Sequence, residues 1–432
     1  MRSRRLLILI ICSFAIISSL QAGGTNFTPL FGARTLSLNG LYIAGTDGLN
    51  CSWTNPAGFA FMTGREINIS LLDRMEQQEF ESPTGGLHRS YRNDDLSLGG
   101  GVYYNIFPGM TAAFAYNKLI DYQVDWPYAT YRRSDSLSSV AAFDMRNQLK
   151  VSAITPSFAI AFGDFALGLG LNVYYISQLI AFPVNNTRWQ NGKGLLAYQF
   201  NYDQNAWSFG FNLGVLANLN DNLRLGISAR SGVKTTLKGK ANSLMFAQLD
   251  SDASSSDLSN EFKLPWIFSL GIVYKLSGSL SLNLDGSYSL WKNIKNNYTF
   301  TFSNQLWQQS LNAFDSLTGF QPGNFQFLTK NCIDAGLGLE YGSLDQGFSY
   351  RLGYRFSQSP IEPASYSLLL PSLDQHWMSI GVGYKSEDLY LDASVTYVLG
   401  VKKEVFRNGL PELSGTYRTN NVVPAITLHF NL

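Results

Sequence analysis

The 432-residue chain has little charge and almost no histidine or cysteine. Lys, Arg, Asp and Glu make up only 15% of it, whereas in soluble proteins they make up about a quarter. The formal net charge is +1, so no basic surface indicates a nucleic-acid partner. His88, His376 and His429 show no metal-binding spacing, and the sequence has no nucleophile elbow. We therefore expect neither an enzyme nor a bound metal or cofactor.

The scarcity of cysteine limits covalent cross-links. Cys12 lies in the apolar N-terminal segment described next, which leaves Cys51 and Cys332. An exported protein permits a disulfide between them. One pair in so long a chain, without a local spacing pattern, favours two free buried thiols instead.

Long hydrophobic runs are also lacking, except at the N-terminus. Residues 1–22 place Arg2, Arg4 and Arg5 before the apolar stretch 6–20 and end in Ala22, a pattern typical of a secretory signal peptide. The alternative is a retained anchor, but the stretch is short for a span of about 20 residues. If the mature protein lies in a membrane, it must be a closed β-barrel, because unpaired strand edges cannot be satisfied in lipid.

What the sequence does contain, from Arg65 onward, is alternation of apolar with polar or small residues. Leu280, Leu282 and Leu284, for example, alternate with polar residues. Tiny turns such as Pro108-Gly109 alternate with long loops, a pattern typical of outer-membrane barrels and not of soluble sandwiches. We predict an all-β fold in which residues 65–432 form a 14-stranded antiparallel transmembrane β-barrel in a Gram-negative outer membrane. The predicted strands are 65–80, 95–107, 111–126, 146–162, 164–181, 203–219, 222–240, 261–276, 279–300, 329–343, 346–358, 374–386, 388–404 and 417–432.

The stretch Gly32–Gly64 is neither a convincing strand nor a long helix, because turn-forming residues interrupt every apolar run. We predict that residues 23–64 form an N-terminal hatch, a plug inside the barrel lumen. Many luminal positions are glycine, including Gly168, Gly214 and Gly353. Glycine weakens a strand unless another group approaches closely, and the plug, a ligand or both would be that group.

Charges in the middle of strands share the parity of the polar face. An arginine facing lipid near the midplane would cost about 2–4 kcal/mol, so we expect these charges to face the lumen. A structural network that holds the plug is preferred to a substrate path. Trp126, Trp207, Trp266 and Trp377 lie near the outer ends of strands and are predicted to form an interfacial aromatic girdle. The predicted luminal network comprises Arg224, Arg230, Asp285, Arg351, Arg355 and Asp392.

Three stretches resemble the FadL-type family of outer-membrane transporters for long-chain fatty acids and other hydrophobic compounds. They are residues 47–58 with Trp-Thr-Asn-Pro-Ala-Gly, residues 264–291 with Leu-Pro-Trp-Ile-Phe-Ser-Leu-Gly, and residues 352–381 with Ser-Pro-Ile and Gln-His-Trp. With the strand count, the resemblance covers essentially the whole mature chain. It implies a monomeric barrel that passes a hydrophobic small molecule to the outer-membrane lipid by passive diffusion.

The resemblance also implies functional residues. Asn55, Pro56 and Ala57 would be the gate of the hatch, which is compatible with an Asx-type turn. A kink in the third strand would open the wall sideways, with Tyr116-Asn117 as the candidate position. The apolar loop residues Leu244, Met245, Phe246 and Leu249 resemble a ligand-capture surface, and ordinary loop packing explains them equally well.

The ligand stays open between fatty acids, aromatic hydrocarbons and other lipids. The alternative function is an accessory or structural outer-membrane barrel in secretion or cell-surface anchoring, because sister families of that kind share the plug motif.

Overall fold

The computed structural model describes residues 32–46, 48–83, 86–127, 144–186, 196–247, 250–294, 298–310, 315–316, 324–325, 328–342, 346–387, 389–406 and 414–432. The predicted signal peptide 1–22, the first part of the predicted hatch and Leu249 lie outside these residues.

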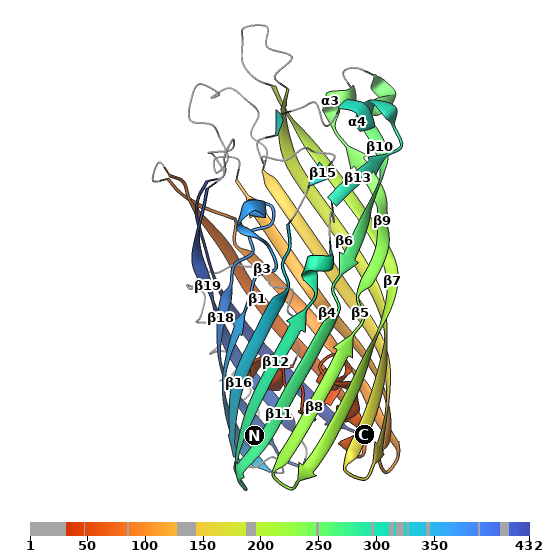
Figure 1. Cartoon of the computed structure of the whole chain (residues 1–432), viewed down its shortest axis with the longest axis vertical. Coiled ribbons are helices and arrows are strands. Elements are labelled where there is room, and N and C mark those ends of the chain that lie inside the picture. The colour runs from red at the N-terminus through yellow and green to blue at the C-terminus, as the bar shows by residue number, and fades with distance from the viewer. Residues whose placement is uncertain are drawn as a thin grey trace, which may run out of the picture.

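The described strands form one closed antiparallel barrel of 14 strands, as predicted (Figure 1). Closure is direct, because β1 (Arg65–Glu81) pairs with β20 on one side and with β3 on the other. The other barrel strands are β3 (Asn93–Phe107), β4 (Met110–Trp126), β5 (Met145–Phe162), β6 (Phe165–Asn186), β7 (Leu196–Asn220), β8 (Leu223–Arg230) continued by β9 (Val233–Asn242), β10 (Ser255–Leu264) continued by β11 (Ile267–Ser277), β12 (Leu280–Ser289) continued by β13 (Tyr298–Phe302), β16 (Cys332–Gly342), β17 (Gly347–Ser357), β18 (Gln375–Lys385), β19 (Tyr390–Val405) and β20 (Gly415–Asn431).

The two ends of the barrel differ. Tight turns such as Pro108-Gly109 and Gly163-Asp164 lie at the lower end in Figure 1, the turn end, and the longer excursions lie at the upper, loop end. No helix in the described part of the chain is long and apolar enough to cross a membrane. The short elements are α2 (Ala33–Ser37), η1 (Gly48–Ser52), η2 (Pro56–Phe61), β2 (Leu87–Arg89), α3 (Leu244–Ala247), η5 (Ser251–Ser254), η6 (Trp291–Asn293), α4 (Gln305–Ser310), β14 (Asp315–Ser316), β15 (Asn324–Phe325) and η8 (Pro363–Ser365).

The alternating sequence produces an apolar outside and a small or polar inside. On β6, Leu167, Leu169 and Leu171 are exposed on the outer surface, whereas Gly168 and Gly170 between them are buried. An apolar band around a barrel is the surface that lipid tails cover.

Three neighbouring strands that the sequence predicted to be continuous are interrupted. The breaks follow Arg230 on β8, Leu264 on β10 and Ser289 on β12, and they lie side by side, because Ile267 pairs with both Arg230 and Ser289. Pro265 has no N–H for the ladder and ends β10. The breaks make room for side chains inside the wall at this level.

Of the four predicted girdle tryptophans, two lie on the outer surface and two are buried. Trp207 and Trp266 are 59% and 41% exposed on the outside. Trp126 is buried and donates its indole N–H to the carbonyl oxygen of Leu368 at 2.6 Å, and buried Trp377 packs beneath the guanidinium of Arg355. The prediction is therefore wrong for Trp126 and Trp377.

The reason for the Trp126 error is a bulge. The register of β4 against β5 shifts between Lys118 and Ile120, so Leu119 is an extra residue. One inserted residue exchanges the inward and outward faces of everything after it.

Candidate functional site

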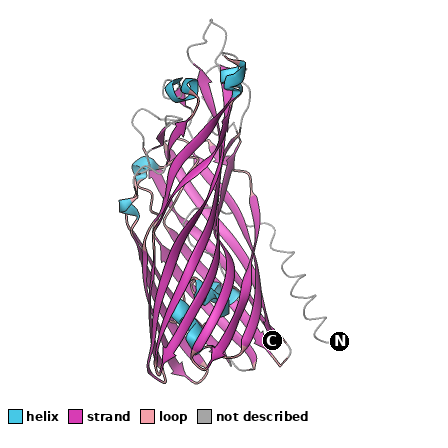
Figure 2. Ribbon diagram, turned by 90° about the vertical axis from the view of Figure 1, so that its right-hand side faces the viewer, coloured by secondary structure: helices cyan, strands magenta, loops and turns pink. Residues whose placement is uncertain are grey.

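Residues 32–46 and 48–62, the luminal segment, lie inside the barrel near the turn end (Figures 1 and 2). Its backbone touches the wall where the wall has glycine. A Cβ added to Gly168 would collide with Pro56 and Ala57, and one added to Gly353 would lie 2.5 Å from the backbone nitrogen of Asn39. These glycines permit the close approach of two backbones.

Asn55 fixes the Asn-Pro-Ala turn of this segment through hydrogen bonds from both its side-chain oxygen and its amide nitrogen. Its side-chain oxygen accepts a hydrogen bond from the backbone N–H of Ala57 at 3.1 Å, which caps η2. Its amide nitrogen donates to the carbonyl oxygens of Ile43 and Val215, each at 3.0 Å. Pro56 occupies the first helical position, where its missing N–H costs nothing. The Asn-Pro-Ala element is thus a capped turn that is hydrogen-bonded to the wall.

Asp285 of β12 forms a second attachment. Its carboxylate accepts hydrogen bonds from the backbone N–H of Ile43 at 2.7 Å and from the Asn39 amide at 3.1 Å. A carboxylate that would be costly in lipid is here satisfied by the luminal segment.

A buried ionic network forms the third attachment. Arg34 of the luminal segment pairs with Glu340 at 2.9 Å, and Glu340 also pairs with Arg351 at 2.6 Å. Arg351 continues to Asp392, and Nε2 of His429 lies 3.2 Å from Asp392. Glu66 completes the chain at 2.8 Å from Nδ1 of His429.

Sequence reasoning singled out only Arg351 and Asp392 from this network. It missed Arg34, Glu66, Glu340 and His429. The inward parity of Glu340 and His429 on their strands was the available signal, and it was applied only to some of the charges.

The remaining predicted luminal charges also lie inside. Arg355 is fully buried, with its Nε 3.5 Å from Asp334. Arg224 donates to Asn218 at 2.7 Å and lies over the ring of Phe61 in the luminal segment.

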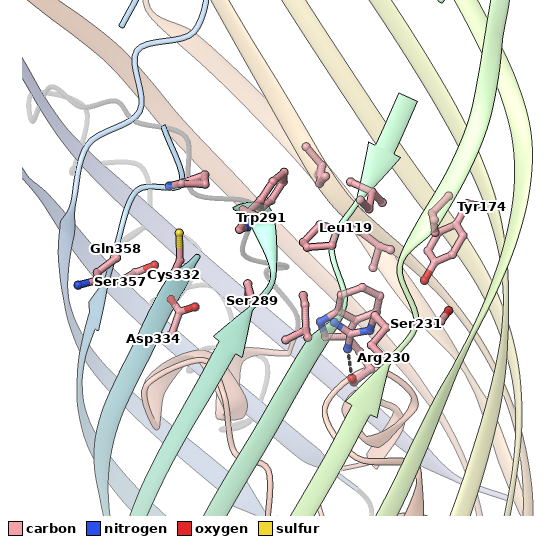
Figure 3. A pocket seen from close by; sticks show the side chains of 17 residues that line it. Leu119, Tyr174, Arg230, Ser231, Ser289, Trp291, Cys332, Asp334, Ser357 and Gln358 are labelled. Carbon is pink, nitrogen blue, oxygen red and sulfur yellow. Dashed lines mark hydrogen bonds between the residues drawn. The ribbon is translucent and has the colours of Figure 1, made fainter. Parts of the chain in front are cut away.

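An apolar pocket lies at the broken strands, and Arg230 projects into it (Figure 3). Its apolar lining includes Trp53, Leu119, Ile120, Leu264 and Trp291. The guanidinium lies over the ring of Trp53 and donates from Nη2 to the Trp53 carbonyl oxygen. Among the described residues no carboxylate pairs with Arg230, and its buried Nε has no hydrogen-bond partner. The pocket therefore combines a mainly apolar lining with the carboxylate of Asp334 and with one cation, Arg230, whose Nε donor is unused.

The backbone ladder between β3 and β4 stops part-way along the two strands. Their pairing runs from the turn at residues 108–109 only as far as Gly100 and Tyr116. Beyond this point β3 still pairs with β1 and β4 still pairs with β5. At the upper end, the backbone N–H of Tyr91 donates to the backbone carbonyl oxygen of Asp125 at 2.7 Å. We call the interval between residues 93–99 and 117–124 the β3–β4 window.

The window and the pocket meet at the β4 bulge. Asn117 and Lys118 line the cavity in the window, and the next residues, Leu119 and Ile120, line the pocket. In the luminal segment Asn50 lines the window cavity and Trp53 lines the pocket.

Residues 49–53 of the luminal segment therefore separate the two spaces. Wall amides hold Ser52 between them: Asn117 donates to its hydroxyl at 3.2 Å, and Asn212 donates to its carbonyl oxygen at 2.6 Å. Of the two candidate positions for the kink, Tyr116 is the last residue paired with β3, and Asn117 contacts the luminal segment. The bulge itself is at Leu119.

The described ligand-capture candidates lie at the loop end, and they differ in exposure. Leu244 is 74% exposed, whereas Met245 and Phe246 are buried. Phe246 packs against Trp307 and Phe200, with ring centroids 4.7 and 5.9 Å away. Packing therefore accounts for Phe246, and Leu244 is the exposed apolar side chain among the three described residues.

Comparison with known proteins places the chain in a family. A family model described as "Outer membrane protein transport protein (OMPP1/FadL/TodX)" matches residues 42–431. The chain is 27% identical over 272 residues to the long-chain fatty acid transport protein of Escherichia coli K12, a match that covers 55% of this chain and 57% of that protein. It is 25% identical over 201 residues to outer membrane protein P1 of Haemophilus influenzae, covering 46% and 40%. The chain thus spans about half the length of the curated relatives it matches.

Solved structures show the same fold. A FadL homologue from Pseudomonas aeruginosa superposes with a TM-score of 0.74 at 15% identity, covering 95% of this chain and all (100%) of that one. The toluene transporter TodX from P. putida gives a TM-score of 0.72 at 14% identity, covering 93% and 98%.

Proposed function

The chain belongs to the outer membrane protein transport protein family (OMPP1/FadL/TodX), and on that premise we propose that it transports long-chain fatty acids across the outer membrane by passive diffusion. Its named relatives are transport proteins and channels rather than enzymes. In this proposal a ligand is captured at the loop end, enters the apolar pocket and leaves sideways through the β3–β4 window.

The continuity of pocket and window along β4 carries the proposal. Four successive residues, 117–120, line first the window cavity and then the pocket. On this route an apolar ligand would move from an apolar pocket directly into the lipid without crossing water. A small displacement of residues 49–53 would join the two spaces, which gives the luminal segment the role of a hatch with Asn55, Pro56 and Ala57 as its anchored turn.

Arg230 supports a carboxylate-bearing ligand within this scheme. The residue donates to the Trp53 carbonyl oxygen, so it ties the separating stretch to the wall. The bond from Arg230 to the Trp53 carbonyl has one charged partner, whereas a carboxylate would add a second charge and could accept two parallel N–H bonds from the guanidinium. A fatty-acid carboxylate in the pocket would therefore compete with the Trp53 carbonyl for Arg230 and release the stretch that blocks the window.

Neutral aromatic hydrocarbons are the second candidate ligands, because a structural neighbour is a toluene transporter. The pocket lining is apolar enough for them, but they would leave Arg230 without an anionic partner.

The test is uptake by Gram-negative cells that lack their own transporter of this type. Cells displaying the protein, or carrying empty vector, receive labelled oleate and, in parallel, labelled toluene. We expect oleate uptake above vector and a smaller effect on toluene. A folded, surface-displayed barrel that raises the uptake of neither compound would contradict the proposal and favour an accessory role.

A further inference from the structure

One edge of the β3–β4 window is charged. Lys118 and Asp121, on either side of the β4 bulge, form an ion pair. Asp121 also faces Lys150 of β5, whose Nζ lies 3.9 Å from the second carboxylate oxygen. That separation is beyond hydrogen-bond distance, and the Lys150 side chain is 38% exposed. Lys150 is therefore a loosely paired cation at the outer rim of the window.

Asp121 also spans the window. The hydroxyl of Ser97 on β3 donates to its carboxylate at 3.3 Å, and Nη1 of Arg74 donates to its backbone oxygen at 3.3 Å. These side-chain bridges replace the backbone ladder that is missing here. The carboxylate that neighbours Lys150 is thus the same group that holds the two edges of the window together.

The opposite edge of the window, on β3, carries two exposed apolar side chains. Leu96 and Leu98 on the outer face of β3 are 63% and 56% exposed. The window therefore has a partly exposed lysine, Lys150, at its β4–β5 edge and two exposed leucines on β3. A fatty acid could contact the lysine with its carboxylate and the leucines with its tail.

The window also lies where the outer surface changes character. On β4 the exposed side chains below it are Phe114 and Tyr116, and on β5 Phe158 is exposed. Above this level the outward pairs are polar, Asp121 with Lys150 and Gln123 with Gln148. An apolar band that ends at an aromatic residue marks the boundary between lipid tails and headgroups.

From this arrangement we infer that Lys150 binds the carboxylate of a fatty acid as it leaves through the β3–β4 window, while the tail lies along Leu96 and Leu98. The inference rests on the proposed function and adds a headgroup contact on the exit side. The ammonium group gains a close counter-ion in place of the distant Asp121 oxygen, and the carboxylate stays at headgroup level as its tail enters the lipid.

Lys150→Met tests this, because methionine keeps the length of the side chain and removes its charge. We expect initial oleate uptake to fall about fivefold and uptake of oleyl alcohol, the neutral analogue, to stay unchanged. Lys150→Arg should retain oleate uptake. Lys238 on β9 is an exposed lysine outside the window, so Lys238→Met should change the uptake of neither compound. Heat-modifiable migration on gels and surface display confirm that each variant is folded.

The outcomes separate the two proposals. If the native protein takes up neither compound, the proposed function itself fails. If the native protein takes up oleate, but Lys150→Met lowers the uptake of both compounds equally or of neither compound, only the role of Lys150 is overturned. Anionic groups of membrane lipid could also pair with Lys150. An oleate-specific loss in cells that disappears in phosphatidylcholine proteoliposomes would assign the lysine to lipid and overturn the inference.

Discussion

Asn55 donates its side-chain amide to two carbonyl oxygens in different parts of the molecule, Ile43 in the luminal segment and Val215 in the barrel wall, each at 3.0 Å. One buried side chain therefore fixes the turn of the segment and its position against β7. Because the Val215 carbonyl oxygen of β7 accepts a hydrogen bond from Asn55, the backbone of the wall holds the luminal segment in place.

We predict that Asn55→Ala leaves a folded barrel with a loosened luminal segment. Removing the amide leaves buried backbone groups unpaired, at a cost of about 1–3 kcal/mol. Hydrogen exchange of residues 48–61 should accelerate, and oleate uptake should change. Asn283→Ala is the matched control, because Asn283 is buried but bonds only to the wall at Gly338. Equal exchange rates in both variants would reduce the Asn-Pro-Ala element to a local turn.

Arg230 should discriminate ligands by charge. Arg230→Met keeps an apolar side chain in the pocket and removes the group that bonds to the Trp53 carbonyl. We expect oleate affinity, measured by isothermal titration of the purified protein, to fall about tenfold. Binding of oleyl alcohol should be retained. An unchanged oleate affinity would mean that the carboxylate is bound elsewhere.

Gly168 should be intolerant of any side chain. A Cβ at this position would overlap Pro56 and Ala57, and overpacking of this kind costs about 1–3 kcal/mol. Gly168→Ala should therefore displace the luminal segment and expose Arg34 to trypsin, while the barrel still shows heat-modifiable migration. In Gly286→Ala, where the added Cβ has its nearest neighbour 3.6 Å away, trypsin should cut no faster than in the native protein.

Glu340 of the wall forms two ion pairs, one with Arg34 of the luminal segment and one with Arg351 of the neighbouring strand. Glu340→Ala removes the carboxylate between Arg34 and Arg351, and breaking a buried pair costs about 3–5 kcal/mol. The urea midpoint for loss of the folded band should fall clearly. Glu261→Ala removes an exposed carboxylate that pairs with Lys234 and Lys263, which is worth about 0–1 kcal/mol. Similar midpoints for the two variants would argue against a structural role for the network.

The barrel could be predicted from sequence because its signals are local and repeated. Alternation such as that of Leu167, Leu169 and Leu171 recurs in most strands, and each short turn repeats the topology. Strand parity was also sufficient to place Asp285 and Arg351 inside. Family resemblance added the Asn-Pro-Ala turn, which no periodicity would have singled out.

The details of the site depend on single irregular residues that leave no periodic signal. The extra residue Leu119 reverses the parity of the rest of β4, so Trp126 was placed on the wrong face. Pro265 was visible in the sequence, but the breaks beside it at Ser231 and Leu290 belong to other strands and follow from their pairing. The charges of the window could not be grouped in advance, because Asp121 and Lys150 meet only through that shifted register.

The most direct measurement is uptake through a window that is covalently locked. Ser97→Cys and Asp121→Cys place thiols where the native side chains lie 3.3 Å apart across the window. The background carries Cys51→Ala and Cys332→Ala, which remove two buried cysteines that form no disulfide. Oxidation, or a short thiol-reactive cross-linker, should reduce oleate uptake to the level of empty vector, and a reductant should restore it. The two single-cysteine variants serve as controls. Full uptake through a quantitatively cross-linked window would show that the ligand takes another path and would contradict lateral exit between β3 and β4.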